Sequence, residues 1–163
     1  MVNGRWSMVN GESAMDPGPL TMDHSARRVA QVEKEGWLGL RKLGQAYWAQ
    51  ARADHATAIT LLDAGVYYAS VFFSQQVAEK ALKAAAINKQ NKNPKGHHLI
   101  QIANSLDAPI EVMNAAAELN AEFLSARNPD AVDGVPAMMY DQKSARLHLK
   151  AAETILEWVK GTF

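Results

Sequence analysis

The chain contains no cysteine among its 163 residues. This absence excludes disulfide bonds, zinc sites built on thiolates and a cysteine nucleophile. The sequence also has no apolar run of the roughly 18 residues that a membrane-spanning helix needs. Its first residues lack the apolar core of a secretory signal, so the sequence predicts a cytoplasmic protein.

Neither sign of charge is in excess, since 17 basic residues balance 17 acidic ones. The charges are nevertheless unevenly distributed. Residues 66–98 hold five lysines and one glutamate, whereas residues 99–141 hold seven acidic residues and a single base, Arg127. A basic face can attract phosphate groups even when the total charge is zero. Ordinary solvated helix faces give the same pattern, so charge alone does not predict nucleic-acid binding.

No stretch alternates clearly enough to predict a strand, whereas helical periodicity is clear from Trp37 onward. Apolar residues make up 48% of the sequence, and its length suits one hydrophobic core. The pattern predicts a long helix that ends near Gly65, a second over about 66–89, and a short one after His97. Two more follow, one on each side of a breaker-rich loop, and Asp141 is the expected N-cap of the last. The predicted fold class is therefore all-α, an up-and-down antiparallel bundle of four to five helices.

The first 35 residues differ from the rest of the chain. Residues 1–4 are echoed by residues 8–11, and Asp-Pro-Gly-Pro at 16–19 is a cluster of structure breakers. We therefore predict two parts, a mobile or loosely docked N-terminal segment over 1–35 and a helical domain over 36–163.

Five short stretches of the helical domain carry recognisable motifs. The most specific is 75–84, Gln-Gln-Val-Ala-Glu-Lys-Ala-Leu-Lys-Ala, and the others are 48–54, 58–65, 97–99 and 126–130. In this order they resemble the HEPN family, named for higher eukaryotes and prokaryotes nucleotide-binding. The resemblance covers 37–163 and implies a HEPN-like helical fold. The stretch 126–130 departs from the family's Arg-Tyr-Pro-Asp motif, because Asn128 replaces the usual Tyr.

The resemblance implies a module that binds nucleotide or RNA phosphates. This sequence is similar to the branch whose members resemble helical partners of minimal nucleotidyltransferases. That branch implies a partnership with such an enzyme, as in a toxin–antitoxin-like pair. We also predict a homodimer, because the helix over about 66–89 is apolar in more directions than one neighbouring pair of helices can cover, and because members of the family often dimerise. No cofactor is expected. Many HEPN proteins are metal-independent ribonucleases that use an Arg followed four to six residues later by a His. After Arg127 those positions hold Ala131, Val132 and Asp133, so the usual motif is missing.

Three functions follow from this comparison. The favoured one is a non-catalytic binding module. The alternatives are a metal-independent ribonuclease with a degenerate motif, which would use Arg127 with His97, and a purely structural interaction domain.

The predicted central helix carries two candidate ligand-binding residues, Lys80 and Lys83. They share one arc of the helix with Glu79 and could meet phosphate as point charges. Alternatively they form internal ion pairs with Glu79 and with Asp54 on the preceding helix, because carboxylates on an apolar stripe need a paired charge. Asp54 and Glu79 are supporting residues in either interpretation.

His97 is a candidate for ligand binding and for any catalysis, since an imidazole titrates near neutral pH. The alternative is that His97 or the adjacent His98 caps or packs the short helix. No carboxylate at the spacing of a zinc site accompanies the two histidines, so no metal site is predicted.

Arg127 is the second candidate for ligand binding and catalysis. It could bind phosphate through two parallel hydrogen bonds, or hold its loop through Asp130 or a backbone carbonyl. Asp130 and Tyr140 are supporting candidates. Tyr140 follows two methionines and either belongs to a ligand lid or fills the end of the bundle.

Overall fold

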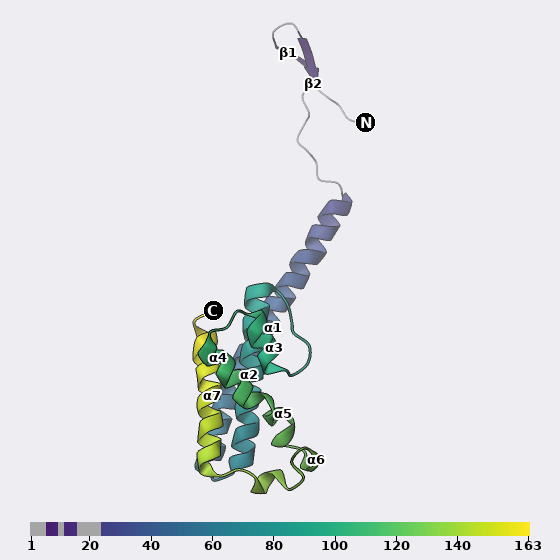
Figure 1. Cartoon of the computed structure of the whole chain (residues 1–163). Helices are drawn as coiled ribbons and strands as arrows, with labels where there is room; N and C mark the ends of the chain where they lie inside the picture. The colour runs from purple at the N-terminus through teal and green to yellow at the C-terminus, as the bar shows by residue number, and fades with distance from the viewer. Residues whose placement is uncertain (1–5, 10–11, 16–23) are drawn as a thin grey trace. The chain divides into compact units, whose positions relative to one another are not determined.

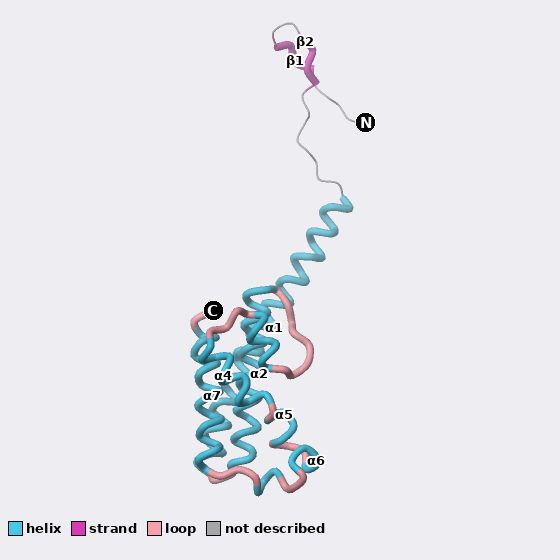
Figure 2. Tube along the Cα trace, in the orientation of Figure 1, coloured by secondary structure: helices cyan, strands magenta, loops and turns pink. Residues whose placement is uncertain are grey.

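A computed structural model describes residues 6–9, 12–15 and 24–163, and the chain forms two units, 1–36 and 37–163. Helices account for most of the second unit, as Figure 1 and Figure 2 show. None of the described helices is long and apolar enough to cross a membrane. The all-α fold class of the helical domain is confirmed. In chain order the helices are α1 (His24–Asp63), α2 (Tyr67–Gln90), α3 (Leu99–Ser105), α4 (Ile110–Asn120), α5 (Glu122–Ser125), α6 (Pro129–Val132), the 3₁₀ turn η1 (Pro136–Met138) and α7 (Gln142–Lys160).

The turn at Gly65 reverses the chain between α1 and α2. Gly65 has a φ of 75°, in the left-handed region where the missing Cβ avoids a steric penalty. The N–H of Val66 donates to the carbonyl of Leu61 at 2.9 Å, and that of Gly65 donates to Leu62 at 3.1 Å. These two bonds form a Schellman motif, which satisfies the last carbonyls of α1. Farther along, the Ser70 hydroxyl donates to the carbonyl of Ala58 at 2.8 Å, so α2 runs back along α1.

The start of α7 is fixed by a capping box, which confirms Asp141 as its N-cap. The Asp141 carboxylate accepts from the backbone N–H of Ser144 at 2.7 Å, and the Ser144 hydroxyl accepts from the N–H of Asp141 at 3.1 Å. The loop predicted before it is more ordered than expected, because it contains α6 and η1. The helix predicted upstream of that loop is broken at Ala121 into α4 and α5.

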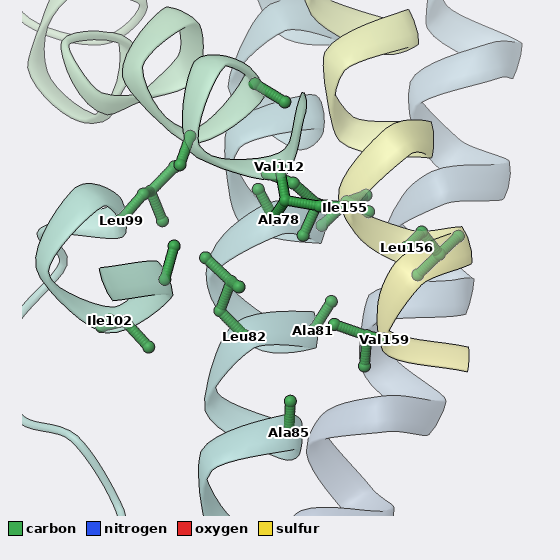
Figure 3. Packing of buried hydrophobic residues seen from close by; sticks show 14 of the residues in the cluster. Ala78, Ala81, Leu82, Ala85, Leu99, Ile102, Val112, Ile155, Leu156 and Val159 are labelled. Carbon is green, nitrogen blue, oxygen red and sulfur yellow. The ribbon is translucent and has the colours of Figure 1, made fainter. Parts of the chain in front are cut away.

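Helix α2 lies at the centre of the bundle and contacts α3, α4, α5 and α7. Figure 3 shows its buried side chains packed against those of α3, α4 and α7. Five of its fourteen buried residues are alanines, which let neighbouring backbones approach closely. Its fully buried alanines are Ala78, Ala81, Ala84, Ala85 and Ala86. The homodimer was predicted because α2 is apolar in so many directions. Within the chain, α3, α4, α5 and α7 all contact α2, which is more than one pair of helices, so the homodimer stays a prediction that now depends mainly on the family resemblance.

The buried apolar side chains form two clusters. The larger one surrounds Leu82 and includes Leu99, Val112 and Ile155. The smaller one is centred on Val71, and is made of Ala58, Leu62, Val71, Ala126, Ala145 and Leu149. Phe72, Phe73 and Tyr140 pack against this smaller cluster. It therefore supports the end of the bundle where the candidate site lies.

The N-terminal unit differs from the sequence-based expectation in two ways. Strands β1 (Trp6–Val9) and β2 (Glu12–Met15) pair antiparallel, with Trp6 opposite Met15, where no strand was predicted. Each strand is too short for its alternation to be distinguished from chance. Helix α1 begins at His24 rather than near Trp37, and Val29 and Val32 on this added part are exposed. Periodicity reveals only a buried face, so it missed a helical stretch without one. The predicted mobility of 1–35 stays a prediction, and part of that segment, 1–5, 10–11 and 16–23, lies outside the described residues.

Replacing Leu82 by alanine tests the central position of α2. Leu82 has no exposed surface, so Leu82→Ala should lower the free energy of unfolding by about 2–5 kcal/mol, through lost burial and a residual cavity. Leu147→Ala is the matched control, because Leu147 is 56% exposed on α7, and it should cost less than about 0.5 kcal/mol. Urea unfolding followed by circular dichroism measures both. Equal losses for the two variants would contradict the packing described.

Candidate functional site

A buried ion pair joins the last third of α1 to the middle of α2. Asp54 is only 4% exposed, and its Oδ2 lies 2.7 Å from Nζ of Lys80, in an ion pair without a directed hydrogen bond. Its Oδ1 accepts from the side-chain amide of Gln50 at 2.8 Å, and Nζ of Lys80 donates to the side-chain carbonyl of Gln76 at 2.7 Å. Lys80 thus neutralises a carboxylate that would otherwise be buried alone.

Glu79, the neighbour of Lys80, is the centre of a second buried group. Nζ of Lys83 donates to its Oε1 at 2.9 Å, and Nδ1 of His97 lies 2.9 Å from both carboxylate oxygens. Burial opposes ionisation of Glu79, but the hydrogen bonds and charge of Lys83 and the bond from His97 outweigh it and lower the pKa of Glu79. Lys83 also lies 5.9 Å from the ring centre of Tyr47. Glu79 is therefore held ionised between two partners.

The structure gives both candidate lysines internal partners. The side chain of Lys83 is 9% exposed and that of Lys80 is 20% exposed, and each faces a buried carboxylate. A phosphate at either lysine would have to compete with that carboxylate. Direct phosphate binding by Lys80 and Lys83 remains a prediction, while their internal ion pairs are observed.

His97 is anchored on one side and open on the other. Because the ionised Glu79 can only accept, Nδ1 of His97 carries the proton of that bond. Among the residues that the structure describes, Nε2 has no hydrogen-bond partner, and the side chain is 49% exposed. His98 precedes α3 but its side chain forms no cap. The first N–H of α3, that of Leu99, instead donates to the side chain of Asn120 at 2.9 Å.

Phe123 on α5 joins the two predicted site residues. The ring of His97 stacks on the Phe123 ring with centroids 3.9 Å apart, and Cζ of Arg127 lies 4.0 Å from the same centroid. Two groups this close to one ring centre would overlap on a shared face, so they lie on opposite faces. Cζ of Arg127 is also 5.3 Å from the ring centre of Phe72. We call this series, His97–Phe123–Arg127–Phe72, the stacked column.

Arg127 is held by uncharged groups. Its Nε donates to the backbone carbonyl of Phe123 at 2.7 Å, and its guanidinium packs on aromatic rings. In the described part of the chain no carboxylate forms an ion pair with it, and Asp130 lies exposed on α6. Of the two structural alternatives for Arg127, the backbone carbonyl is the one observed. The residue itself is exposed at the surface.

A partly buried group of polar side chains links α5 to α7. Glu122 accepts hydrogen bonds from the hydroxyl of Tyr140 and from Nε2 of His148, the latter at 3.3 Å. Nδ1 of His148 lies 2.7 Å from the carbonyl of Ser144. Both ring nitrogens therefore face acceptors, an arrangement that favours the doubly protonated imidazolium. We call Glu122, Tyr140 and His148 the α5–α7 cluster, and it fixes the turn that carries Phe123.

Each pKa in the α5–α7 cluster is shifted in the direction that favours this charge pattern. Burial alone would raise the pKa of Glu122, but the hydrogen bonds from His148 and Tyr140 have the larger effect, so the pKa of Glu122 is lowered overall. Burial alone would lower the pKa of His148. Glu122, the Ser144 carbonyl and the charge of Glu118 have the larger effect, so the pKa of His148 is raised overall. Burial and Glu122 together raise the pKa of Tyr140, which stays protonated.

Two surface grooves flank the stacked column. One, of about 380 Å³, is lined by His97, His98, Ala121 and Phe123 among others. The other, of about 430 Å³, is lined by Tyr68, Phe72, Arg127 and Val135 among others. Within residues 24–163 and the two strands, no three side chains of the ligand types are placed to hold a metal ion.

Comparison with known proteins identifies the family. Residues 45–162 match the HEPN domain. The chain belongs to the HEPN family. TT1696 from Thermus thermophilus is 29% identical, with a TM-score of 0.70 over 74% of this chain and 98% of that one. ST0689, an archaeal HEPN homologue, is 28% identical, with a TM-score of 0.65 over 72% and 95% of the two chains.

A HEPN domain protein from Thermotoga maritima, tm0613, is 26% identical, with a TM-score of 0.55 over 71% of this chain and 95% of that one. No curated protein matches the chain. The HEPN match includes the predicted site residues Asp54, Glu79, Lys80, His97 and Arg127. The resemblance drawn from the motifs is thus confirmed for family and fold, while the roles of individual residues remain to be tested.

The sequence-based interpretation missed several residues of the site. Phe123 was not among the predicted site residues, although a spacing of four residues before Arg127 brings two side chains together wherever the backbone is helical. His148 and Glu122 were not predicted either. Their pairing depends on how α5 meets α7, and no local pattern encodes it.

Lys80→Ala tests the buried ion pair between α1 and α2. Removing the ammonium leaves the Asp54 carboxylate buried without a counter-charge, which should cost about 3–5 kcal/mol of unfolding free energy. Lys150→Ala is the control, because Lys150 is 77% exposed and 4.0 Å from Glu153, and an exposed pair contributes about 0–1 kcal/mol. Chemical denaturation measures both, and a loss below about 1 kcal/mol for Lys80→Ala would mean that Asp54 is solvated.

The α5–α7 cluster predicts a dependence of stability on pH. The raised pKa of His148 contributes stability that is complete below its ordinary value of 6.5 and is lost as the pH rises through the folded-state value. The lowered pKa of Glu122 contributes stability that is complete above 4.5 and is lost on acidification through its folded-state value. The melting temperature of the wild type should therefore exceed that of His148→Gln most clearly between pH 4.5 and 6.5. A constant difference up to about pH 9 would show that His148 is neutral in the fold.

Proposed function

We propose that this HEPN domain is a non-catalytic module that binds nucleotide or RNA phosphates at the stacked column. The observation that supports the proposal is the state of Arg127, an exposed guanidinium that is rigidly held without a carboxylate partner in the described part of the chain. A guanidinium offers five N–H donors, and only Nε is used internally. Its outer edge can therefore meet two phosphate oxygens at once.

His97 would be the second polar contact. Its Nε2 could accept from a ribose hydroxyl when the imidazole is neutral, and could donate to a phosphate oxygen when the imidazole is protonated. Glu79 sets this orientation through Nδ1. In this proposal Lys83 and Lys80 act indirectly, by holding Glu79 and Asp54 in place through ion pairs, and Tyr140 acts through Glu122.

Arg127→Ala should weaken binding of a fluorescently labelled single-stranded RNA about tenfold or more, because a charge-assisted bidentate contact is lost. Arg127→Lys should restore only part of the affinity, since an ammonium lacks the planar fork of donors. Arg146→Ala removes the same charge from an exposed position on α7 and is the control. Fluorescence anisotropy measures all three. Equal affinity of Arg127→Ala and the wild type would refute the phosphate site.

A degenerate ribonuclease is a second candidate function, because one specific observation favours it. His97 and Arg127 lie on the two faces of a single ring, although they are distant in sequence. A phosphate that spans the ring edge would meet a charge and a titratable group together. The binding-module proposal predicts that single-stranded RNA stays intact with purified protein. Cleavage that persists in a chelator and disappears in both Arg127→Ala and His97→Ala would favour the ribonuclease instead.

We also propose a homodimer that acts beside a minimal nucleotidyltransferase, in a toxin–antitoxin-like pair. The support is the resemblance to that branch of the family, because the His of the usual ribonuclease motif is missing at Ala131, Val132 and Asp133. Sedimentation equilibrium at tens of micromolar should give twice the mass of one chain. Co-expression with a nucleotidyltransferase encoded next to this chain should give a complex that survives purification. A chain that sediments as a monomer and purifies without the nucleotidyltransferase would contradict this part of the proposal.

A further inference from the structure

The larger groove beside the stacked column has two apolar walls. Tyr68, Ala69 and Phe72 from the first turns of α2 form one wall, and Val135 and Ala137 around η1 form the other. Arg127 lies at the groove and is the only charged residue among those that line it. Its guanidinium is placed 5.3 Å from the ring centre of Phe72, so the charge and the aromatic wall are in contact.

The local sequence explains why a groove of about 430 Å³ opens here. Ala69 and Ala137 present only a methyl group where larger side chains would fill the space between α2 and η1. Pro136 begins η1 and is buried, and proline fixes the backbone at this position. Tyr68 keeps 36% of its surface exposed, and Val135 keeps 55%. The walls are thus anchored at their base and open to solvent above.

Apolar, partly aromatic walls with a single cation are complementary to a ligand that is flat and apolar at one end and anionic at the other. The volume lies within the range of about 300–1,000 Å³ that is usual for small-molecule sites. All four nucleobases can stack on aromatic side chains, because each of them has a π-face. The groove therefore matches a nucleotide better than it matches a free phosphate, which would use only Arg127.

We propose that this groove holds the base of a nucleotide whose phosphate lies on the outer edge of the Arg127 guanidinium. The base would lie between Tyr68 and Val135, close to Phe72. This inference rests on the proposed function, since it places the phosphate on Arg127. The proposed function places only the phosphate. The inference also states on which side of the stacked column the base lies, and it assigns Tyr68, Ala69 and Ala137 to the binding site.

The inference is tested by comparing ligands that differ only in the base. Binding of the four ribonucleoside 5′-monophosphates and of ribose 5-phosphate to the full chain is measured by NMR titration. At least one nucleotide should bind about tenfold more tightly than ribose 5-phosphate, which is a typical effect of stacking one base. Ala137→Leu fills the groove without removing a charge. It should abolish this advantage and leave the affinity for ribose 5-phosphate unchanged.

Ala121→Leu is the matched control, because Ala121 lines the smaller groove on the His97 side. It should leave the nucleotide advantage intact. Loss of the advantage in Ala121→Leu but not in Ala137→Leu would place the base in the smaller groove and overturn the inference. Tyr68→Ala offers an independent check, since it removes a wall rather than filling the space. An unchanged advantage in both Tyr68→Ala and Ala137→Leu would also overturn it.

Failure of this inference is distinguishable from failure of the proposed function. Equal affinities for nucleotides and ribose 5-phosphate, both lost in Arg127→Ala, would overturn the base groove and leave the phosphate site standing. If none of the small ligands binds, the inference that the groove holds a base is overturned as well. The proposed function would then be decided by the RNA titration alone.

Discussion

Helix α2 lies at the centre of the bundle, and alanine stands at five of its fourteen buried positions. These small side chains let the surrounding helices approach closely on several sides. A charge on the buried part of such a helix must then find its partner inside the protein. Asp54 with Lys80, and Glu79 with Lys83 and His97, are the two groups that meet this requirement. The second group reaches the surface, and the candidate site begins there.

From Glu79 outward, each side chain of the site is positioned by the one before it. Glu79 orients the imidazole of His97, and His97 and Arg127 enclose Phe123. The backbone carbonyl of the same Phe123 holds Nε of Arg127. The preceding residue, Glu122, belongs to the α5–α7 cluster, so α7 determines where α5 lies. The site is therefore formed by α2, α5, α7 and the loop that precedes α3, although only a few of its atoms are exposed.

Sequence reasoning succeeded where the relevant physics is local. The helices of the domain follow from apolar periodicity, and Gly65 and Asp141 mark boundaries because each satisfies backbone groups of its own helix. The pairing of Lys80 with Asp54 was one of two stated alternatives, because a carboxylate on an apolar stripe needs a cation. The stacked column and the α5–α7 cluster were not predicted, since they depend on how α5 lies against α7. The first turns of α1 were missed for a different reason, because Val29 and Val32 there are exposed and form no apolar face. Strands β1 and β2 were missed because each is only four residues long, too short for a pattern to be visible.

The anchoring of Arg127 has a consequence for how the protein should respond to ionic strength. A guanidinium fixed by ring faces and a carbonyl is held by short-range contacts, and mobile ions screen such contacts little. A phosphate approaching the same guanidinium is attracted over distances comparable with the Debye length, about 8 Å at physiological salt. Added salt should thus weaken the attraction of a ligand while the guanidinium keeps its position. The two effects are separable in this protein because no carboxylate shares the charge of Arg127 in the described part of the chain.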